Sequence, residues 1–140
     1  MLAAPATLLS AAVTILAALL LIYMIVPVGR ARGKHGIQAP AMTGHEDLER
    51  AVRVHMNTIE QFVIFLPLLW VATTYFHLVG WLPAALGLVW IIGRIMYMQG
   101  YLADPAKRST GFLVTAVASI GLLILSVIGV VMAWMAVTAA

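Results

Sequence analysis

Two groups of residues, each within one predicted helix, have the residue types and spacing of a binding site. One group is spaced by three, four and three residues and consists of Arg50, Arg53, Asn57 and Glu60. The other is spaced by four, three and four residues and consists of Trp90, Arg94, Tyr97 and Tyr101. Side chains three or four residues apart lie on the same face of an α-helix. Each group is therefore predicted to form a polar stripe along one helix.

The chemistry of these stripes suits a small zwitterionic or anionic ligand. Guanidinium groups bind carboxylates, a carboxylate binds an ammonium group, and amides and phenols supply neutral donors. The residues that offer these groups are Arg53, Asn57, Glu60, Arg94, Tyr97, Tyr101 and Arg108. A second interpretation is a structural ion pair between Glu60 and Arg94, because charges within a membrane usually pair inside the bundle. That pair leaves the other residues of the set without a role.

The composition places these stripes in a membrane. Hydrophobic residues make up 64% of the 140-residue chain and charged residues 9%, and the mean hydropathy is +1.05. A soluble protein of this length needs a far more charged surface, whereas about 20 apolar residues in a helix span a bilayer. We predict an all-α membrane protein with a single four-helix domain over residues 1–140. Its transmembrane helices are expected at about residues 8–28, 46–76, 82–102 and 105–137.

Local signals indicate where these helices end. The first apolar run is too long for the hydrophobic part of a typical signal peptide, so we expect it to be retained. It is predicted to end near Gly29, where a polar connector begins. Thr43 and Glu46 have the spacing of a capping box at the start of the second helix. Asp104 and Pro105 indicate an N-cap followed by the first residue of the fourth helix.

Charge is concentrated at one end of the predicted bundle. The cations in or beside the connectors after the first and third helices are Arg30, Arg32, Lys34, Arg50, Arg53, Lys107 and Arg108. In the loop at the opposite end, His77 is the only titratable side chain. Lysine and arginine accumulate in the cytoplasmic loops of membrane proteins. We therefore predict a multi-pass membrane protein with both charged connectors cytoplasmic and both termini non-cytoplasmic.

Several kinds of chemistry are not expected. The chain has no cysteine, so a disulfide, a thiolate metal site and a cysteine nucleophile are excluded, and any reacting sulfur must come from a substrate. His35, His45 and His77 are interpreted as dispersed in loops without metal-ligand spacing, so no metal is expected. The net charge of +3 comes from eight cations, which are too few to form an independent nucleic-acid surface.

Three motifs resemble those of the MAPEG family, the membrane-associated proteins of eicosanoid and glutathione metabolism. Residues 53–60 resemble its R-x-H-x-N-x-x-E signature, and residues 93–101 resemble its G-R-x-x-Y-x-x-G-Y segment. Residues 104–108 resemble the P-x-K-R motif that follows. The likeness covers about residues 32–119 and is strongest toward the third microsomal glutathione transferase type and leukotriene-C synthase.

The resemblance implies a four-helix protomer, a homotrimer, and glutathione bound as co-substrate between subunits near the cytoplasmic face. The positions that match glutathione-binding residues are Arg32, Arg53, Asn57, Glu60, Arg94, Tyr97 and Tyr101. Arg108 matches the arginine that activates the thiol. Further candidate ligand contacts are His55, Gln61 and Gln99. His55 suits a subunit contact equally well, and Gln61 replaces a tyrosine of the leukotriene synthase, which weighs against eicosanoid specificity.

We therefore expect a detoxifying glutathione transferase, with glutathione peroxidase activity as an addition. Its partners would be glutathione, a lipophilic electrophile or lipid hydroperoxide, membrane lipid and other copies of the chain. One alternative is a non-catalytic lipid-binding scaffold of the same family, which the retained Arg108 disfavours. Another is a small four-helix multidrug antiporter. The carboxylate of an antiporter must take up and release a proton. The nearby guanidiniums of Arg53, Arg94 and Arg108 would oppose this, because cations favour the charged form.

Overall fold

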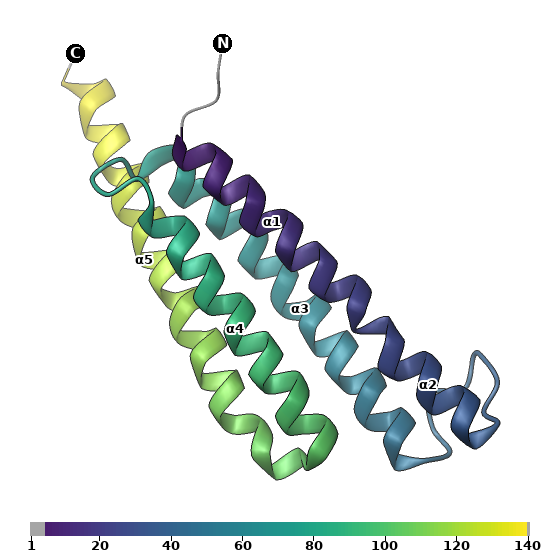
Figure 1. Ribbon diagram of the computed structural model, residues 1–140. Helices are drawn as coiled ribbons and strands as arrows, with labels where there is room; N and C mark the ends of the chain where they lie inside the picture. The colour runs from purple at the N-terminus through teal and green to yellow at the C-terminus, as the bar shows by residue number, and fades with distance from the viewer. Residues whose placement is uncertain (1–4, 140) are drawn as a thin grey trace.

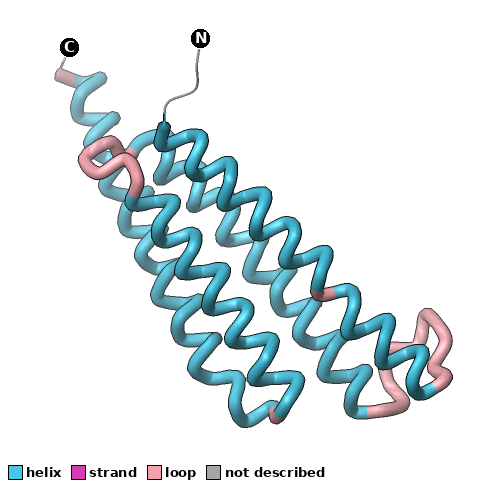
Figure 2. Tube along the Cα trace, viewed as in Figure 1, coloured by secondary structure: helices cyan, strands magenta, loops and turns pink. Residues whose placement is uncertain are grey.

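The computed structural model describes residues 5–139, which form helices joined by short loops (Figure 2). The elements in chain order are α1 (Pro5–Tyr23), α2 (Ile25–His35), α3 (Glu46–Tyr75), α4 (Leu82–Ala103), the 3₁₀ helix η1 (Pro105–Arg108) and α5 (Ser109–Thr138). They make four rods long and apolar enough to cross a membrane: α1 with α2, α3, α4, and η1 with α5. The prediction of an all-helical protein with four transmembrane helices is confirmed.

The four rods run side by side, and the connectors are divided between the two ends of the bundle (Figure 1). The loop between α2 and α3 lies at the same end as η1, which joins α4 to α5. The loop between α3 and α4 lies at the opposite end, close to the start of α1. The two charged connectors therefore share one end, here called the charged end. Its cytoplasmic position stays a prediction.

The first rod differs from the sequence prediction because its helix continues beyond Gly29. A proline has no N–H to donate to the carbonyl four residues before it, and its ring crowds that carbonyl. For Pro27 this carbonyl belongs to Tyr23, where α1 ends, and helical structure resumes at Ile25. The chain then stays helical to His35, and Gly36 ends α2 in the left-handed conformation with φ of 65°. The predicted start of the connector at Gly29 was wrong.

The start of α3 also differs in its cap. His45 is the N-cap residue, and its Nδ1 accepts a hydrogen bond from the backbone N–H of Asp47 at 3.1 Å. The predicted capping box between Thr43 and Glu46 does not form, because Glu46 is already the first residue of the helix. Asp104, by contrast, caps as predicted and accepts from the Ala106 N–H at 2.9 Å. It caps η1, and α5 begins four residues later.

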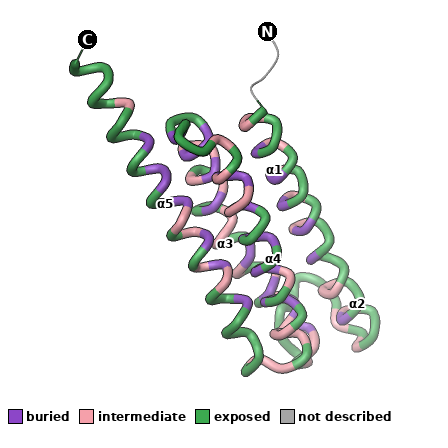
Figure 3. Tube along the Cα trace, turned by 60° about the vertical axis from the view of Figure 1, so that its left-hand side comes forward, coloured by how far each residue is buried: buried purple, intermediate pink, exposed green. Residues whose placement is uncertain are grey.

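The core lies between the rods, while their outer faces are apolar and exposed (Figure 3). The rings of Phe65 on α3 and Trp90 on α4 are both fully buried and stack with centroids 4.1 Å apart. Gly111 lets α5 approach α4 closely, because a side chain there would collide with the backbone of Tyr97. Exposed apolar faces are expected where lipid replaces water as the solvent. The bundle therefore holds the two polar stripes in a packed apolar frame.

Candidate functional site

Arg94 brings the two polar stripes together at the charged half of the bundle. Its side chain is fully buried between α4 and α3. Nη2 donates to Asn57 Oδ1 at 3.1 Å and to Thr58 Oγ1 at 2.8 Å, and Nε donates to Thr58 Oγ1 at 3.2 Å. Its Cζ lies 4.0 Å from the centroid of the Tyr97 ring. The two stripes therefore lie at the same depth in the bundle.

The structural ion pair between Glu60 and Arg94 is not present. Among residues 5–139, the ion pairs lie around the connector between α2 and α3, and none involves Arg94. Glu60 is exposed and accepts a hydrogen bond from Asn57 Nδ2 at 3.2 Å. Thr58 and Glu60 are two residues apart, which corresponds to about 200° around a helix. Glu60 therefore points away from the side of α3 on which Thr58 meets Arg94. The interpretation of these two residues as a buried pair was wrong.

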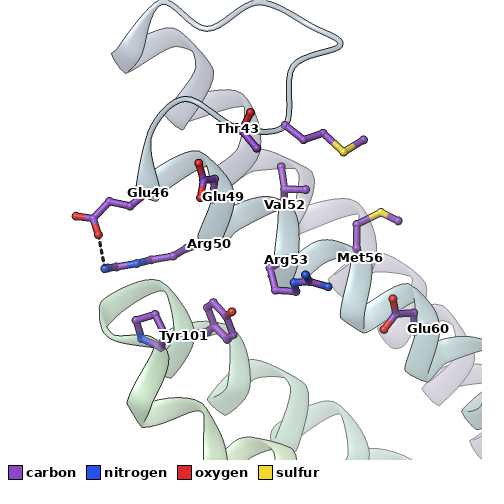
Figure 4. Close-up of a pocket in the computed structure, with 11 residues that line it drawn as sticks. Thr43, Glu46, Glu49, Arg50, Val52, Arg53, Met56, Glu60 and Tyr101 are labelled. Carbon is purple, nitrogen blue, oxygen red and sulfur yellow. Dashed lines mark hydrogen bonds and ion pairs between the residues drawn. The ribbon is translucent and has the colours of Figure 1, made fainter.

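Two open hollows flank Arg53 and Tyr101, which line both of them. One hollow, of about 640 Å³, lies along the first turns of α3 and reaches Glu60 (Figure 4). The other, of about 770 Å³, is lined by Arg53, Asn57, Tyr97, Tyr101, Arg108, Ser109, Phe112 and Leu113. The second hollow thus combines guanidinium, amide and phenol groups with an apolar wall from α5. Such a wall next to polar groups suits a ligand with one polar and one apolar part.

Arg108 reaches the second hollow from the last residue of η1. Its side chain is exposed, and its Cζ lies 5.4 Å from the centroid of the Tyr101 ring. Gly100 allows η1 to lie close to α4, since a Cβ there would stand 2.6 Å from the Lys107 carbonyl oxygen. The cap from Asp104 and the close contact at Gly100 together hold Arg108 at the mouth of the site.

The other predicted site residues take different places. Arg94 lies behind the hollows and contacts two of their lining residues, Asn57 and Tyr97. Besides Arg94, the candidates that line neither hollow are Arg32, His55, Gln61 and Gln99. Arg32 is half-buried on α2, and its buried Nη1 has no hydrogen-bond partner among the described residues. One copy of the chain therefore gathers seven of the predicted residues and leaves these four apart.

The structure adds residues that the sequence reasoning missed. Thr58 contacts Arg94 directly, and Phe112 and Leu113 form the apolar wall. Thr58 lies at helical spacing with the buried residues Ala51, Val54 and Phe65. A hydroxyl on an otherwise apolar buried face indicates a polar partner on a neighbouring helix, and this signal could have identified Thr58.

His35 and His45 are close together, which corrects their interpretation as dispersed histidines. Their rings stack with centroids 3.4 Å apart, and with Asp47 they offer ligand atoms within 4.8 Å of one another. However, the Asp47 carboxylate already accepts from Lys34 at 2.9 Å and meets His35 Nε2 at 2.8 Å. Nearly parallel rings also direct their lone pairs along parallel planes rather than toward one point. We interpret the cluster as a polar contact that joins α2 to α3.

Comparison with known proteins settles the family. A sequence profile described as the MAPEG family matches residues 10–128. The chain belongs to the MAPEG family. Family membership and the four apolar rods together make it a multi-pass integral membrane protein.

Curated relatives agree with the MAPEG assignment. Microsomal glutathione S-transferase 2 of Homo sapiens is 42% identical over 106 residues, which cover 76% of this chain and 71% of the relative. Leukotriene C4 synthase of Cavia porcellus is 38% identical over 121 residues, covering 86% of this chain and 79% of the relative. An uncharacterised protein of Synechocystis sp. is 43% identical over 114 residues, covering 81% and 82%. The motifs favoured the third microsomal type and the synthase, and these MAPEG relatives represent the second type and the synthase.

Proposed function

We propose that this protein is a membrane-bound glutathione transferase that conjugates glutathione to lipophilic electrophiles. The observation that carries the proposal is the second hollow, where Arg53, Asn57, Tyr97, Tyr101 and Arg108 face an apolar wall. The similarity to Microsomal glutathione S-transferase 2 supports the same activity. Because the chain has no cysteine, the nucleophilic sulfur must belong to the substrate.

Glutathione offers two carboxylates, one ammonium group and one thiol, and the polar residues complement them. Arg53 would bind a carboxylate, and Glu60 the ammonium group. Asn57 and the two tyrosines would supply neutral hydrogen bonds, with Tyr97 supported from behind by Arg94. The exposed guanidiniums of Arg53 and Arg108 are free to meet an anionic ligand, because neither forms an ion pair within residues 5–139.

Arg108 would carry the catalytic step by stabilising the thiolate. A thiol with a pKa of about 8.5 is only a few per cent ionised at neutral pH, and a fixed positive charge beside the sulfur favours the ionised form. The thiol releases its proton to solvent water, and the sulfur forms a bond to the electrophilic carbon. The electron pair displaced from that carbon leaves with a halide or remains on an oxygen that takes up a proton. Phe112 and Leu113 would hold the apolar electrophile next to the thiolate.

The site is proposed to be completed by assembly into a homotrimer with the charged end in the cytoplasm. In one chain the hollows are open, and Arg32 lies on α2 away from both. In a trimer, Arg32 of one protomer would reach the site of its neighbour, and the exposed apolar faces would meet between protomers. Native mass spectrometry should give a mass near three times 15.1 kDa. A dimer or monomer with full activity would contradict this arrangement.

The function is tested by a conjugation assay with purified protein in detergent or lipid nanodiscs. The substrates are glutathione and a halogenated dinitrobenzene, and the product is followed by its absorbance. We expect turnover that saturates with glutathione and calorimetric binding of glutathione in the absence of the electrophile. A folded protein that neither binds glutathione nor forms the conjugate would overturn the proposal.

A further inference from the structure

Arg94 is a buried cation without a carboxylate partner, so its position depends on neutral groups. It is fully buried, and no ion pair within residues 5–139 includes it. Its Nη1 is buried without a hydrogen-bond partner in the same part of the chain. Nε and Nη2 both donate to the single oxygen of Thr58, at 3.2 and 2.8 Å. Thr58 is therefore the main acceptor that fixes the guanidinium.

From this geometry we infer that Thr58 is a positioning residue of the glutathione site, acting through Arg94 on the groups that line it. The inference rests on the proposed function, and it adds a residue that does not itself line either hollow. Thr58 is fully buried on α3, on the side that faces α4.

The hydroxyl of Thr58 is oriented by its own helix. Its O–H donates to the Val54 carbonyl at 2.8 Å, so the oxygen lone pairs remain available to accept from Arg94. The β-branched side chain has few rotamers in a helix, and the bond to the carbonyl selects among them. The position of the Thr58 oxygen is therefore set by α3 itself and does not depend on Arg94.

A chain of hydrogen bonds carries this orientation from Thr58 to the hollows. Arg94 Nη2 also donates to Asn57 Oδ1 at 3.1 Å, which fixes the direction of the Asn57 amide. The amide nitrogen is then directed to Glu60 Oε2, at 3.2 Å. On the other side, the guanidinium lies 4.0 Å from the Tyr97 ring centroid and supports that ring. One hydroxyl thus orients the amide, the carboxylate and a phenol of the proposed site.

Within residues 5–139, Arg94 has no other acceptor to replace the Thr58 oxygen if that oxygen is removed. Nη1 already has no partner among the described residues, so no spare acceptor is present to take over. Removing the Thr58 oxygen leaves Nε without an acceptor and releases one of the two bonds of Nη2. Arg94 then keeps one hydrogen bond, to Asn57, so its guanidinium and the groups of Asn57 and Glu60 that follow it are less firmly oriented. Binding of the ammonium end of glutathione should suffer most, since Glu60 ends the chain of bonds.

The decisive experiment compares Thr58→Val, Thr58→Ser and Thr73→Val in the detergent-solubilised full chain. Valine keeps the branched shape and removes the oxygen, whereas serine keeps the oxygen. Thr73 is the matched control on the same helix: it is buried, donates to the Leu69 carbonyl and meets the Ser10 hydroxyl near the opposite end. Calorimetry gives the Kd, and steady-state kinetics give kcat and KM. Both are measured for glutathione and for an analogue that lacks the α-ammonium group.

For Thr58→Val we expect the glutathione Kd and KM to rise about tenfold, the effect of losing hydrogen bonds to a charged group, with a smaller change in kcat. The rise should be smaller for the analogue without the ammonium. Thr58→Ser should restore the Kd to within about threefold, and Thr73→Val should leave it unchanged. A Kd for Thr58→Val equal to that of Thr73→Val, or equal losses for glutathione and the analogue, would overturn the inference. Absence of binding by the wild type would instead overturn the proposed function.

If Thr58→Val does not fold, Thr58→Cys provides the same comparison, because the cysteine side chain is close to threonine in volume and its sulfur is only a weak acceptor. Its Kd should lie above that of Thr58→Ser. An unchanged Kd in folded Thr58→Cys would overturn the role of the oxygen.

Discussion

The two halves of the bundle join α3 to its neighbours in different ways. In the charged half, Thr58 accepts hydrogen bonds from the buried guanidinium of Arg94 on α4. In the opposite half, Thr73 meets the hydroxyl of Ser10 on α1 at 2.7 Å. Both threonines also donate to the carbonyl four residues before them. The local structure of α3 is therefore the same at both places, and only the partner differs.

The two contacts differ in what they contribute: one holds helices together, and the other lies at the candidate site. A neutral hydroxyl pair joins two helices in the apolar half, so a buried charge is not needed to hold the bundle together. A buried cation is costly in a membrane, and intramembrane charges mark functional sites. Arg94 lies next to the hollows at the charged end and has no carboxylate within ion-pair distance among the described residues. The charged half is thus interpreted as the binding half, and the neutral half as the frame.

The largest effect that tests this comparison is expected for Arg108→Ala. Loss of the positive charge beside the thiol sulfur should lower kcat on the order of a hundredfold, in the range found for removing a group that stabilises developing charge. Glutathione Kd should change far less, because the lost interaction favours the thiolate and the transition state. Steady-state conjugation kinetics and calorimetry measure the two quantities separately.

The neighbouring lysine supplies the control for that variant. Lys107 is exposed in the same 3₁₀ turn but lines neither hollow. Lys107→Ala should therefore leave kcat within about twofold, and Arg108→Lys should recover part of the rate because it keeps the charge. Equal losses for Lys107→Ala and Arg108→Ala would indicate a general field effect and remove the specific role of Arg108.

A smaller effect, on binding, is expected for Arg53→Ala and Glu60→Gln. Each removes a charged hydrogen-bonding group at a hollow, so the glutathione Kd should rise about tenfold or more in each. Calorimetry on folded protein gives these values, and native mass spectrometry shows that assembly is retained. Lys34→Ala is the matched control, because Lys34 pairs with Asp47 and lines neither hollow. Unchanged affinity in the Arg53 and Glu60 variants would place glutathione elsewhere.

The smallest effect is expected in the neutral half. Ser10→Ala removes the contact with Thr73 and should lower the free energy of unfolding by about 0.5–1.5 kcal/mol, as for other single hydrogen bonds. Equilibrium unfolding in mixed detergent measures this change. Glutathione Kd and kcat should stay at their wild-type values. A large change in Kd would show that the two halves are coupled and that the neutral half is more than a frame.

Much of the fold could be predicted because the membrane imposes strong rules on sequence. Long apolar stretches gave the four rods, and clustered cations identified the charged end. The ends of elements were less predictable, since they depend on single backbone groups. Pro27 interrupts the helix at Tyr23 but does not end the rod, because α2 resumes and runs to His35. His45, rather than Thr43, caps α3.

The sequence predicted which helix faces carry the polar residues of the site, but not which residues contact each other. Helical spacing gave one polar stripe on α3 and one on α4, and Arg94 of one stripe meets Asn57 of the other. It could not give the rotation of one helix relative to the other, which decides that Arg94 meets Thr58 rather than Glu60. The stacking of His35 on His45 depends on the path of the loop between them, and no periodic pattern encodes that path. Contacts between copies of the chain, such as that proposed for Arg32, lie beyond what one protomer determines.

The most direct test of a glutathione site at the charged end is the ionisation of the bound thiol. The ultraviolet absorbance of the thiolate is recorded against pH for glutathione bound to the wild type and to Arg108→Ala, with the tripeptide below the protein concentration. In the wild type the midpoint should fall below the free thiol pKa of about 8.5, because the guanidinium of Arg108 favours the charged sulfur. In Arg108→Ala it should return toward that value while glutathione remains bound. A wild-type midpoint at the free value, or the same lowered midpoint in both proteins, would contradict thiol activation by Arg108.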